Sequence, residues 1–309
     1  MFRFALTRIA MALPTLLIVA VSVFVLIRLI PGDPAQLMLG DLATPASLAD
    51  LRARLGLDQS LPVQFGIWIG NVVSGDFGQS ISSQQAVLPL ILERFSVSAT
   101  IVLVAVFFAT FIAVPAWKQD SALDLSLVAT ATLLLSIPTF WLGLLLLLFF
   151  GLKLEWLPVV GYVSIAENPW AGILYLVMPI LTLFLHEIGV ILRMARASTL
   201  EVLRLDYITH ARAKGLSEGA VLWRHAFKNA FGPTWTLIGI LLVTACIGAA
   251  RKGTLLNIPH RGPPRIPATF ARDYPVIQRC MLFVSFTYVL VNLVIDLCYP
   301  VFDPRVTAQ

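Results

Sequence analysis

Residues 172–230 read GILYLVMPILTLFLHEIGVILRMARASTLEVLRLDYITHARAKGLSEGAVLWRHAFKNA and combine two different chemistries. The first part, through Met194, is apolar and long enough to cross the roughly 30 Å hydrocarbon layer of a bilayer, which takes about 20 residues of helix. The last part, residues 206–230, is polar and basic. A chain that passes from one to the other is predicted to leave a membrane here.

The composition of the whole chain agrees with a membrane location. Of its 309 residues 58% are hydrophobic and 13% are charged, whereas an ordinary soluble domain has roughly 25% charged residues. Helices are expected, because unpaired backbone groups are costly in lipid and the apolar runs lack the alternation of a membrane β-barrel. We therefore predict an all-α polytopic membrane protein with about six transmembrane helices. The predicted spans are Ile9–Leu29, Phe95–Trp117, Leu125–Phe150, Gly172–Met194, Phe231–Ala250 and Cys280–Tyr299.

The distribution of Lys and Arg predicts the orientation of these spans. Residues 193–228 hold seven basic residues, whereas residues 31–94 hold three basic and six acidic ones. Because cytoplasmic loops are enriched in Lys and Arg, the 195–230 loop and both termini are predicted to be cytoplasmic. The first apolar run is interpreted as an uncleaved span rather than a signal peptide, since no small-x-small cleavage site follows it before Arg28.

The chain divides into four parts on this topology. Residues 1–30 form the first span, 31–94 an external region, 95–297 the main transmembrane domain with the 195–230 loop, and 298–309 a cytoplasmic tail. In the external region, Thr44 or Ser47 is predicted to cap a short helix that runs through Leu55, and Gly56 to end it.

The polar loop is predicted to contain two helices. Residues 198–214 have helical spacing, Gly215 is placed to end that helix in a left-handed turn, and Ser217 with Glu218 can begin the next one. An apolar stripe follows, and the spacing allows either an interfacial helix on the lipid headgroups or a helix that docks into a groove of a cytoplasmic partner. The stripe consists of Ala220, Trp223, Phe227 and Ala230.

Nearly the whole chain resembles one family. The 195–230 loop is similar to the cytoplasmic EAA-type loop of bacterial ABC importer permeases, with the triplet aligned to Thr209, His210 and Ala211 and its glycine to Gly215; the glutamate of the triplet is absent. The order and spacing of the other motifs resemble the dipeptide/oligopeptide/nickel permease subfamily. These motifs are TRIAMALPTLLIVAVSVFVLIRLIPGDP, GDFGQS, LSIPTFWLGLLLLLFF, WLPVVGY, RASTLEVLRLDYITHARAKGLSE, RHAFKNAFGP, ARDYPVIQ and LVNLVIDLCYPVFDPR.

The resemblance implies a type I ABC importer transmembrane fold with a cytoplasmic coupling helix, in the bacterial inner membrane. The implied partners are a second homologous permease, two ATP-binding subunits, an external solute-binding protein and membrane lipid, with no nucleic acid. This chain lacks G-x-x-x-x-G-K-[ST], the loop that cradles nucleotide phosphates, so ATP and Mg²⁺ are expected on the partner subunits and no cofactor is expected here. The residues expected to couple to the ATPase are Thr209, His210, Ala211, Gly215, Ser217, Trp223 and Phe227.

The implied solute is a di- or oligopeptide, with nickel or another small solute as the alternative, because permeases for both share these motifs. A membrane enzyme is disfavoured. His186-Glu187 lacks the second histidine of H-E-x-x-H, since Val190 stands in its place, and the cysteines have no metal-binding spacing, so no catalytic or metal residues are predicted.

Five residues within the predicted spans are candidates for lining a pathway or for packing between helices. A charged group inside a membrane helix usually faces the bundle interior, where it is paired, neutral or beside a wet cavity. Polar residues there also hold helices together, and prolines bend them. The five are Pro138, Pro179, Glu187, Asn292 and Asp296.

One stretch departs from the family pattern. Residues 246–270 carry Gly253 where a glutamate is expected and HRGPPRIP in place of a Pro-Gly-x-Gly turn. Residues 251–279, which overlap this stretch, are basic, although the predicted topology puts them on the external side. Three hypotheses fit: a displaced reading frame, a specialised loop, or a permease remnant that no longer transports.

Overall fold

The computed structural model describes residues 2–29, 34–40, 43–80, 85–113, 122–252 and 273–302. Within these ranges the named elements are all helices, and the only bridge of the β type is an isolated one between Gln79 and Ala86. The all-α prediction is therefore confirmed. The chain forms two compact units, which are described separately: unit one is Met1–Ala5, Phe95–Gly262 and Val291–Gln309, and unit two is Leu6–Arg94 and Pro263–Leu290.

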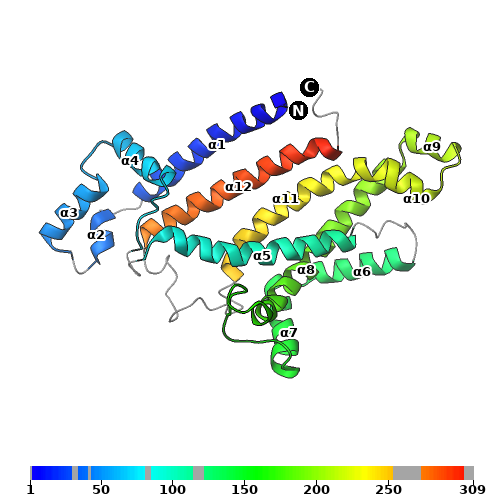
Figure 1. Ribbon diagram of the computed structural model, residues 1–309. Helices are drawn as coiled ribbons and strands as arrows, with labels where there is room; N and C mark the ends of the chain where they lie inside the picture. Colours follow the sequence, from blue (N-terminus) through cyan, green and yellow to red (C-terminus); the bar gives the residue numbers. More distant parts are fainter. Residues whose placement is uncertain are drawn as a thin grey trace. The chain divides into compact units, whose positions relative to one another are not determined.

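Long apolar helices coincide with five of the six predicted spans (Figure 1). Each is long and apolar enough to cross a bilayer, and each extends beyond at least one of the limits predicted from hydropathy. The five helices are α1 (Phe2–Arg28), α5 (Val87–Ala113), α8 (Pro169–Leu203), α11 (Phe227–Lys252) and α12 (Tyr274–Phe302).

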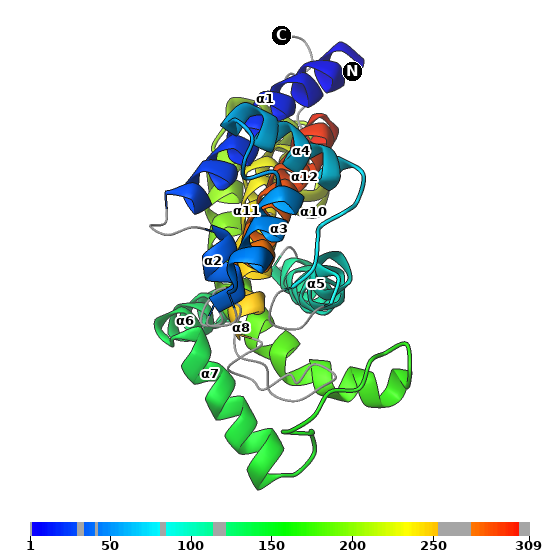
Figure 2. The same cartoon turned by 90° about the vertical axis from the view of Figure 1, so that its left-hand side faces the viewer.

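The span predicted over Leu125–Phe150 is not one helix, which corrects the prediction. It consists of α6 (Ala122–Ser136) and α7 (Thr139–Leu146), and a π-helix, η2 (Leu147–Lys153), continues α7. The two halves meet at 99°, and Figure 2 shows α7 turning away from α6. Pro138 stands at the start of α7. It has no amide hydrogen to donate and it disfavours helical geometry in the preceding residue, so the helix breaks here instead of bending gently.

The core of unit one is built around α8. Buried side chains of α5, α6, α8 and α11 meet there, and Pro179 is accommodated inside α8 without interrupting it. Glycine allows two of the closest approaches. A Cβ on Gly189 would lie 2.9 Å from the carbonyl oxygen of Ala131 on α6, and a Cβ on Gly239 of α11 would collide with the side chain of Ile295 on α12.

Unit two contains the short helices that follow the first span. They are α2 (Pro34–Leu39), α3 (Pro45–Leu55) and α4 (Leu61–Val73). At the start of α3, Thr44 and Ser47 form a reciprocal capping box, so both predicted candidates take part. Gly56 follows the helix with φ 64°, as expected for a left-handed terminating residue.

An aromatic and polar cluster ties α4 to α1 within unit two. Phe24 of α1 contacts Phe65 and Trp68 of α4, with ring centroids 5.2 and 5.7 Å away. The guanidinium of Arg28 lies 3.4 Å from the centroid of the Phe24 ring and donates to the side-chain oxygen of Gln64 at 2.7 Å. Leu282 of α12 completes this buried cluster, so α4 is anchored to the membrane helices α1 and α12.

Candidate functional site: a loop between two membrane helices

The polar loop of unit one joins α8 to α11 through two short helical segments. After α8 ends at Leu203 the chain forms α9 (Asp206–Ala213), turns, and enters α10 (Glu218–Ala220). A π-helix, η3 (Val221–Ala226), then leads directly into α11. Figure 1 shows α9 and α10 together at the end of α11.

Two details of the predicted loop need correction. Residues 198–214 are not one helix, because the backbone leaves helical geometry at Leu205, which has φ −75° and ψ 144°. The second helix is not a short separate element either: it runs without a break from Glu218 through η3 into α11. The helical backbone is therefore continuous from α10 into a membrane helix.

The turn between α9 and α10 has the predicted chemistry. Gly215 has φ 80°, a left-handed conformation that suits glycine, and its amide donates to the carbonyl of Arg212 at 2.9 Å. Ser217 is the N-cap of α10 and accepts a hydrogen bond from the amide of Ala220 at 3.4 Å. Both predictions about this turn are confirmed.

A small apolar cluster, here called the loop core, holds α9 against its neighbours. Ile208 is fully buried, and Ala211 one turn later is nearly so. Their partners come from the end of α8 and from η3 and α11, where small side chains permit close packing. The loop core consists of Val202, Ile208, Ala211, Val221, Ala226 and Ala230.

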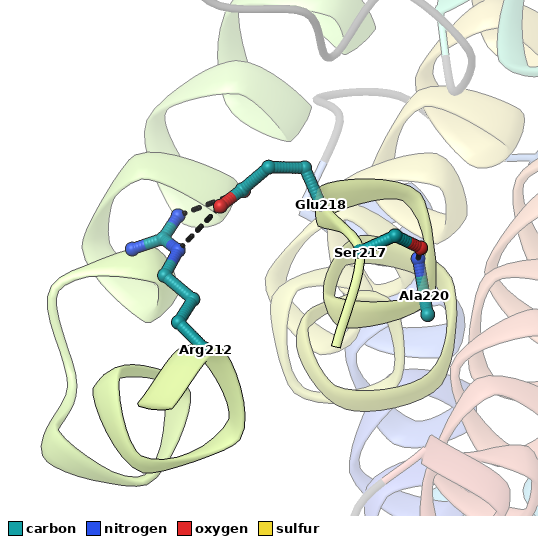
Figure 3. Close-up of polar contacts among 4 residues, drawn as sticks. All are labelled: Arg212, Ser217, Glu218 and Ala220. Atoms are coloured by element: carbon teal, nitrogen blue, oxygen red, sulfur yellow. Dashed lines mark hydrogen bonds and ion pairs between the residues drawn. The ribbon is translucent and has the colours of Figure 1, made fainter. Parts of the chain in front are cut away.

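Polar contacts supplement the loop core on its surface. The guanidinium of Arg212 donates to both carboxylate oxygens of Glu218, at 2.9 Å from Nε and 3.1 Å from Nη2, and Figure 3 shows this pair bridging the turn. At the other end of α9, the hydroxyl of Tyr207 accepts from Nδ2 of Asn229 at 2.7 Å. The same hydroxyl donates to the carbonyl of His225 at 3.4 Å.

The structure separates the aligned triplet into exposed and buried positions. Thr209 and His210 are exposed on α9, whereas Ala211 belongs to the loop core. The small side chain at 211 is thus explained by packing, because a larger one would push α9 away from Val221 and Ala226. Thr209 and His210 remain available to a partner.

The predicted apolar stripe is exposed at its beginning and buried at its end. Trp223 is 57% exposed, whereas Ala230 is buried. Whether the exposed part lies on lipid headgroups or docks into a partner stays a prediction. Phe227 is partly buried and its ring centroid lies 5.5 Å from that of Trp223.

An aromatic row continues from Trp223 along α11. Phe227 stacks on Phe231 with centroids 5.1 Å apart, and Phe231 contacts Phe302 of α12 at 5.0 Å. Trp235 lies next in the row and donates from its indole nitrogen to the carbonyl of Ile295 at 3.3 Å. Contiguous packing therefore connects an exposed residue of the loop with the last membrane helix.

The candidates within the spans are dispersed. Glu187 is 6% exposed in the middle of α8, and Pro179 is buried two turns earlier. Asn292 and Asp296 are half-buried on α12, and Pro138 is exposed at the break between α6 and α7. In the part of the chain that the structure describes, no three His, Cys, Asp or Glu side chains form a group able to hold a metal ion. A pathway or packing role for these residues stays a prediction.

The departing stretch, residues 246–270, lies outside the described residues from position 253 onward. Its first seven residues continue the backbone of α11. The three hypotheses about this stretch therefore stay predictions.

Sequence reasoning missed the contacts of Tyr207, Arg212 and Asn229, and it assigned Glu218 only to the start of the second helix. One signal was present: an arginine and a glutamate stand on either side of a turn glycine, at the favourable ends of their helices. The tie between Tyr207 and Asn229 joins residues far apart along the chain and left no local pattern.

The helices and the loop define a multi-pass membrane protein with a structured loop between two spans, and comparison with known proteins gives its family. The chain belongs to the family described as "Binding-protein-dependent transport system inner membrane component", which matches residues 101–308. The corresponding N-terminal family, "Binding-prot-dependent transport system membrane comp, N-term", matches residues 1–102. The chain is thus a permease-type membrane subunit, as the sequence motifs predicted.

Curated relatives match the chain over almost its full length. A putative peptide transport system permease protein of Brucella suis biovar 1 is 39% identical over 97% of this chain and 98% of its own. A dipeptide transport system permease protein of Alkalihalophilus pseudofirmus is 35% identical over 99% of both chains. A glutathione transport system permease protein of Salmonella paratyphi A is 37% identical over 99% of both chains.

Proposed function

We propose that this chain is the membrane subunit of an ABC importer that carries peptides across the bacterial inner membrane. The observation that carries the proposal is the end-to-end similarity to permeases named for peptides, a dipeptide and glutathione. All three named substrates contain peptide bonds. None of these names mentions nickel, which is why the metal-ion alternative is not favoured.

The proposed complex contains a second homologous permease, two ATP-binding subunits and an external solute-binding protein. Within it, the loop from α8 to α11 receives the ATPase. Its exposed side chains Thr209, His210 and Trp223 are the proposed contacts, while Ala211, Gly215 and Ser217 shape the loop that presents them. Phe227 links that surface to the aromatic row on α11. We place this loop and both termini in the cytoplasm because the loop is rich in Lys and Arg.

The test is reconstitution of the complex in liposomes. The chain is co-expressed with the ATPase, permease and binding-protein genes that neighbour its own, purified through a tag on this chain, and assayed with a dipeptide and with Ni²⁺ as separate solutes. We expect the ATPase to co-purify and the dipeptide-loaded binding protein to stimulate ATP hydrolysis. Stimulation by Ni²⁺ alone would reject the peptide assignment, and an assembled complex that hydrolyses no ATP with either solute would favour the remnant hypothesis.

The coupling role of the loop has its own test. Replacing Trp223 and Phe227 together with alanine removes the aromatic surface but leaves Gly215 and the Ser217 cap in place. We expect weaker co-purification of the ATPase, or loss of solute-stimulated hydrolysis, with normal membrane insertion. Exposed Trp156 provides the control, because it is also a large exposed aromatic residue but lies outside the loop. If the double variant behaves like Trp156→Ala, the loop is an interfacial structure and not the docking site.

A further inference from the structure

The tip of the loop projects beyond its packed core. Residues 212–219 are all exposed, whereas the buried residues of α9, Ile208 and Ala211, lie before them. A Cβ placed on Gly215 would meet nothing within 4 Å. Burial therefore fixes the first part of α9 but does not fix the direction in which the chain turns toward α10.

One side-chain contact spans this exposed turn. Arg212 in the last turn of α9 and Glu218 in the first turn of α10 form a two-point contact, and their side chains are 40% and 67% exposed. A planar guanidinium that meets both carboxylate oxygens restrains orientation as well as distance. The neighbouring Lys214 is likewise exposed, and within the described residues its side chain shows no hydrogen bond or ion pair, so the contact is specific to Arg212.

We propose that the Arg212–Glu218 pair is a brace that fixes the angle between α9 and α10. The inference rests on the proposed function: α9 receives movement from the ATPase, and α10 is continuous with the membrane helix α11. An exposed pair contributes little to overall stability, and the loop core supplies the packing. The brace instead positions the tip, so that displacement of α9 is passed to α10 and is not lost by bending at Gly215.

The structural test measures hydrogen exchange in the purified complex for the peptide covering residues 206–217. This segment includes the amides of Lys214 and Gly215, which donate to the carbonyls of His210 and Arg212. We expect faster exchange in Arg212→Gln and Glu218→Gln, by about two- to five-fold, the range that corresponds to an exposed ion pair. Lys214→Gln removes the same charge from the same helix end and should exchange like the wild type.

A double-mutant cycle then separates a pair from two independent residues. Arg212→Gln/Glu218→Gln should have no larger effect than either single change, because the second substitution removes nothing further. The same three variants are then compared for the amount of peptide transported per ATP hydrolysed. We expect each variant to lower this ratio by about two- to five-fold. Additive effects, or unchanged exchange in both single variants, would overturn the brace.

These outcomes are distinguishable from a failure of the proposed function. If the wild-type complex transports no peptide, the proposed function fails, while hydrogen exchange still reports on the brace. If Arg212→Gln releases the ATPase and Glu218→Gln does not, Arg212 contacts the ATPase directly and the brace is rejected. If both single variants keep the ATPase bound and lose coupling equally, the brace is supported.

Discussion

Gly215 has a conformation that few other residues adopt at low cost. With φ 80° and open space around it, a new side chain would encounter backbone strain and no collision. We expect Gly215→Ala to destabilise the loop by about 1 kcal/mol, because the left-handed conformation is unfavourable for residues with a Cβ. Limited proteolysis of the purified protein should then cut near residue 215 more readily.

Gly219 is the matched control, since it too is exposed and would meet nothing within 4 Å, but it lies in helical α10. Gly219→Ala should stabilise the loop by roughly 0.5–1 kcal/mol. Equal protease sensitivity of Gly215→Ala and Gly219→Ala would contradict a cost of the left-handed conformation at residue 215.

Gly239 is required for a different reason. Its backbone lies so close to Ile295 that an added methyl group would overlap that side chain, so either the Ile295 side chain or the two helices would have to shift. We expect Gly239→Ala to cost about 1–3 kcal/mol, the usual range for overpacking, seen as a lower thermal unfolding temperature in detergent. Gly239→Ala combined with Ile295→Ala should recover part of this loss. No recovery in the double variant would show that the contact does not limit the approach of these helices.

At the scale of elements, the break between α6 and α7 depends on Pro138. Pro138→Ala supplies an amide hydrogen and removes the free-energy cost of about 3 kcal/mol that proline imposes on a continuous helix. We expect the 99° bend to decrease. Spin labels at Leu125 and Leu148, both exposed, should then move apart relative to the wild type. An unchanged distance would mean that packing of α6 and α7 against α8, not the proline, sets the bend.

Trp68 joins the short helix α4 to the first membrane helix, α1. Truncating a buried aromatic residue costs about 3–5 kcal/mol, so Trp68→Ala should loosen α4 from Phe24 and expose the segment 61–73 to protease. Trp170 is a suitable control because it is largely exposed. Equal protease resistance of the two alanine variants would contradict an anchoring role for Trp68.

Sequence patterns predicted what depends on local chemistry. The long apolar helices, the capping residues Thr44 and Ser47, and the turn at Gly215 all follow from residues close together in the chain. Three features did not. Pro138 predicted a bend within the apolar run Leu125–Phe150, but not that the run would break into two helices that meet at 99°. The π-helix η3 was not predicted, because no sequence period announces it. The contact between Arg212 and Glu218 depends on how two helices turn, which spacing alone does not specify.

At the scale of the whole molecule, orientation in the membrane is open to direct measurement. Single cysteines are introduced at Lys214 and Asp58 in a chain whose native cysteines are replaced by alanine. An impermeant maleimide should label the Asp58→Cys variant in intact spheroplasts and the Lys214→Cys variant only after permeabilisation, because the proposed topology puts the more basic loop in the cytoplasm. Labelling of Lys214→Cys in intact spheroplasts would reverse the proposed topology.

The π-helix η3 has a consequence for how such loops can be exchanged between related permeases. A π-helix usually arises from one extra residue inserted into an α-helix, and each residue of an α-helix turns the chain by about 100°. Because each π-helical residue turns the chain through a smaller angle, deleting one residue between Val221 and Ala226 would return η3 to α-helical geometry and leave the loop in nearly the same orientation about the axis of α11. A chimaera that joins the loop of one permease to the membrane helix of another can therefore absorb a one-residue difference across η3, whereas the same difference elsewhere in α11 would rotate the loop by about 100°.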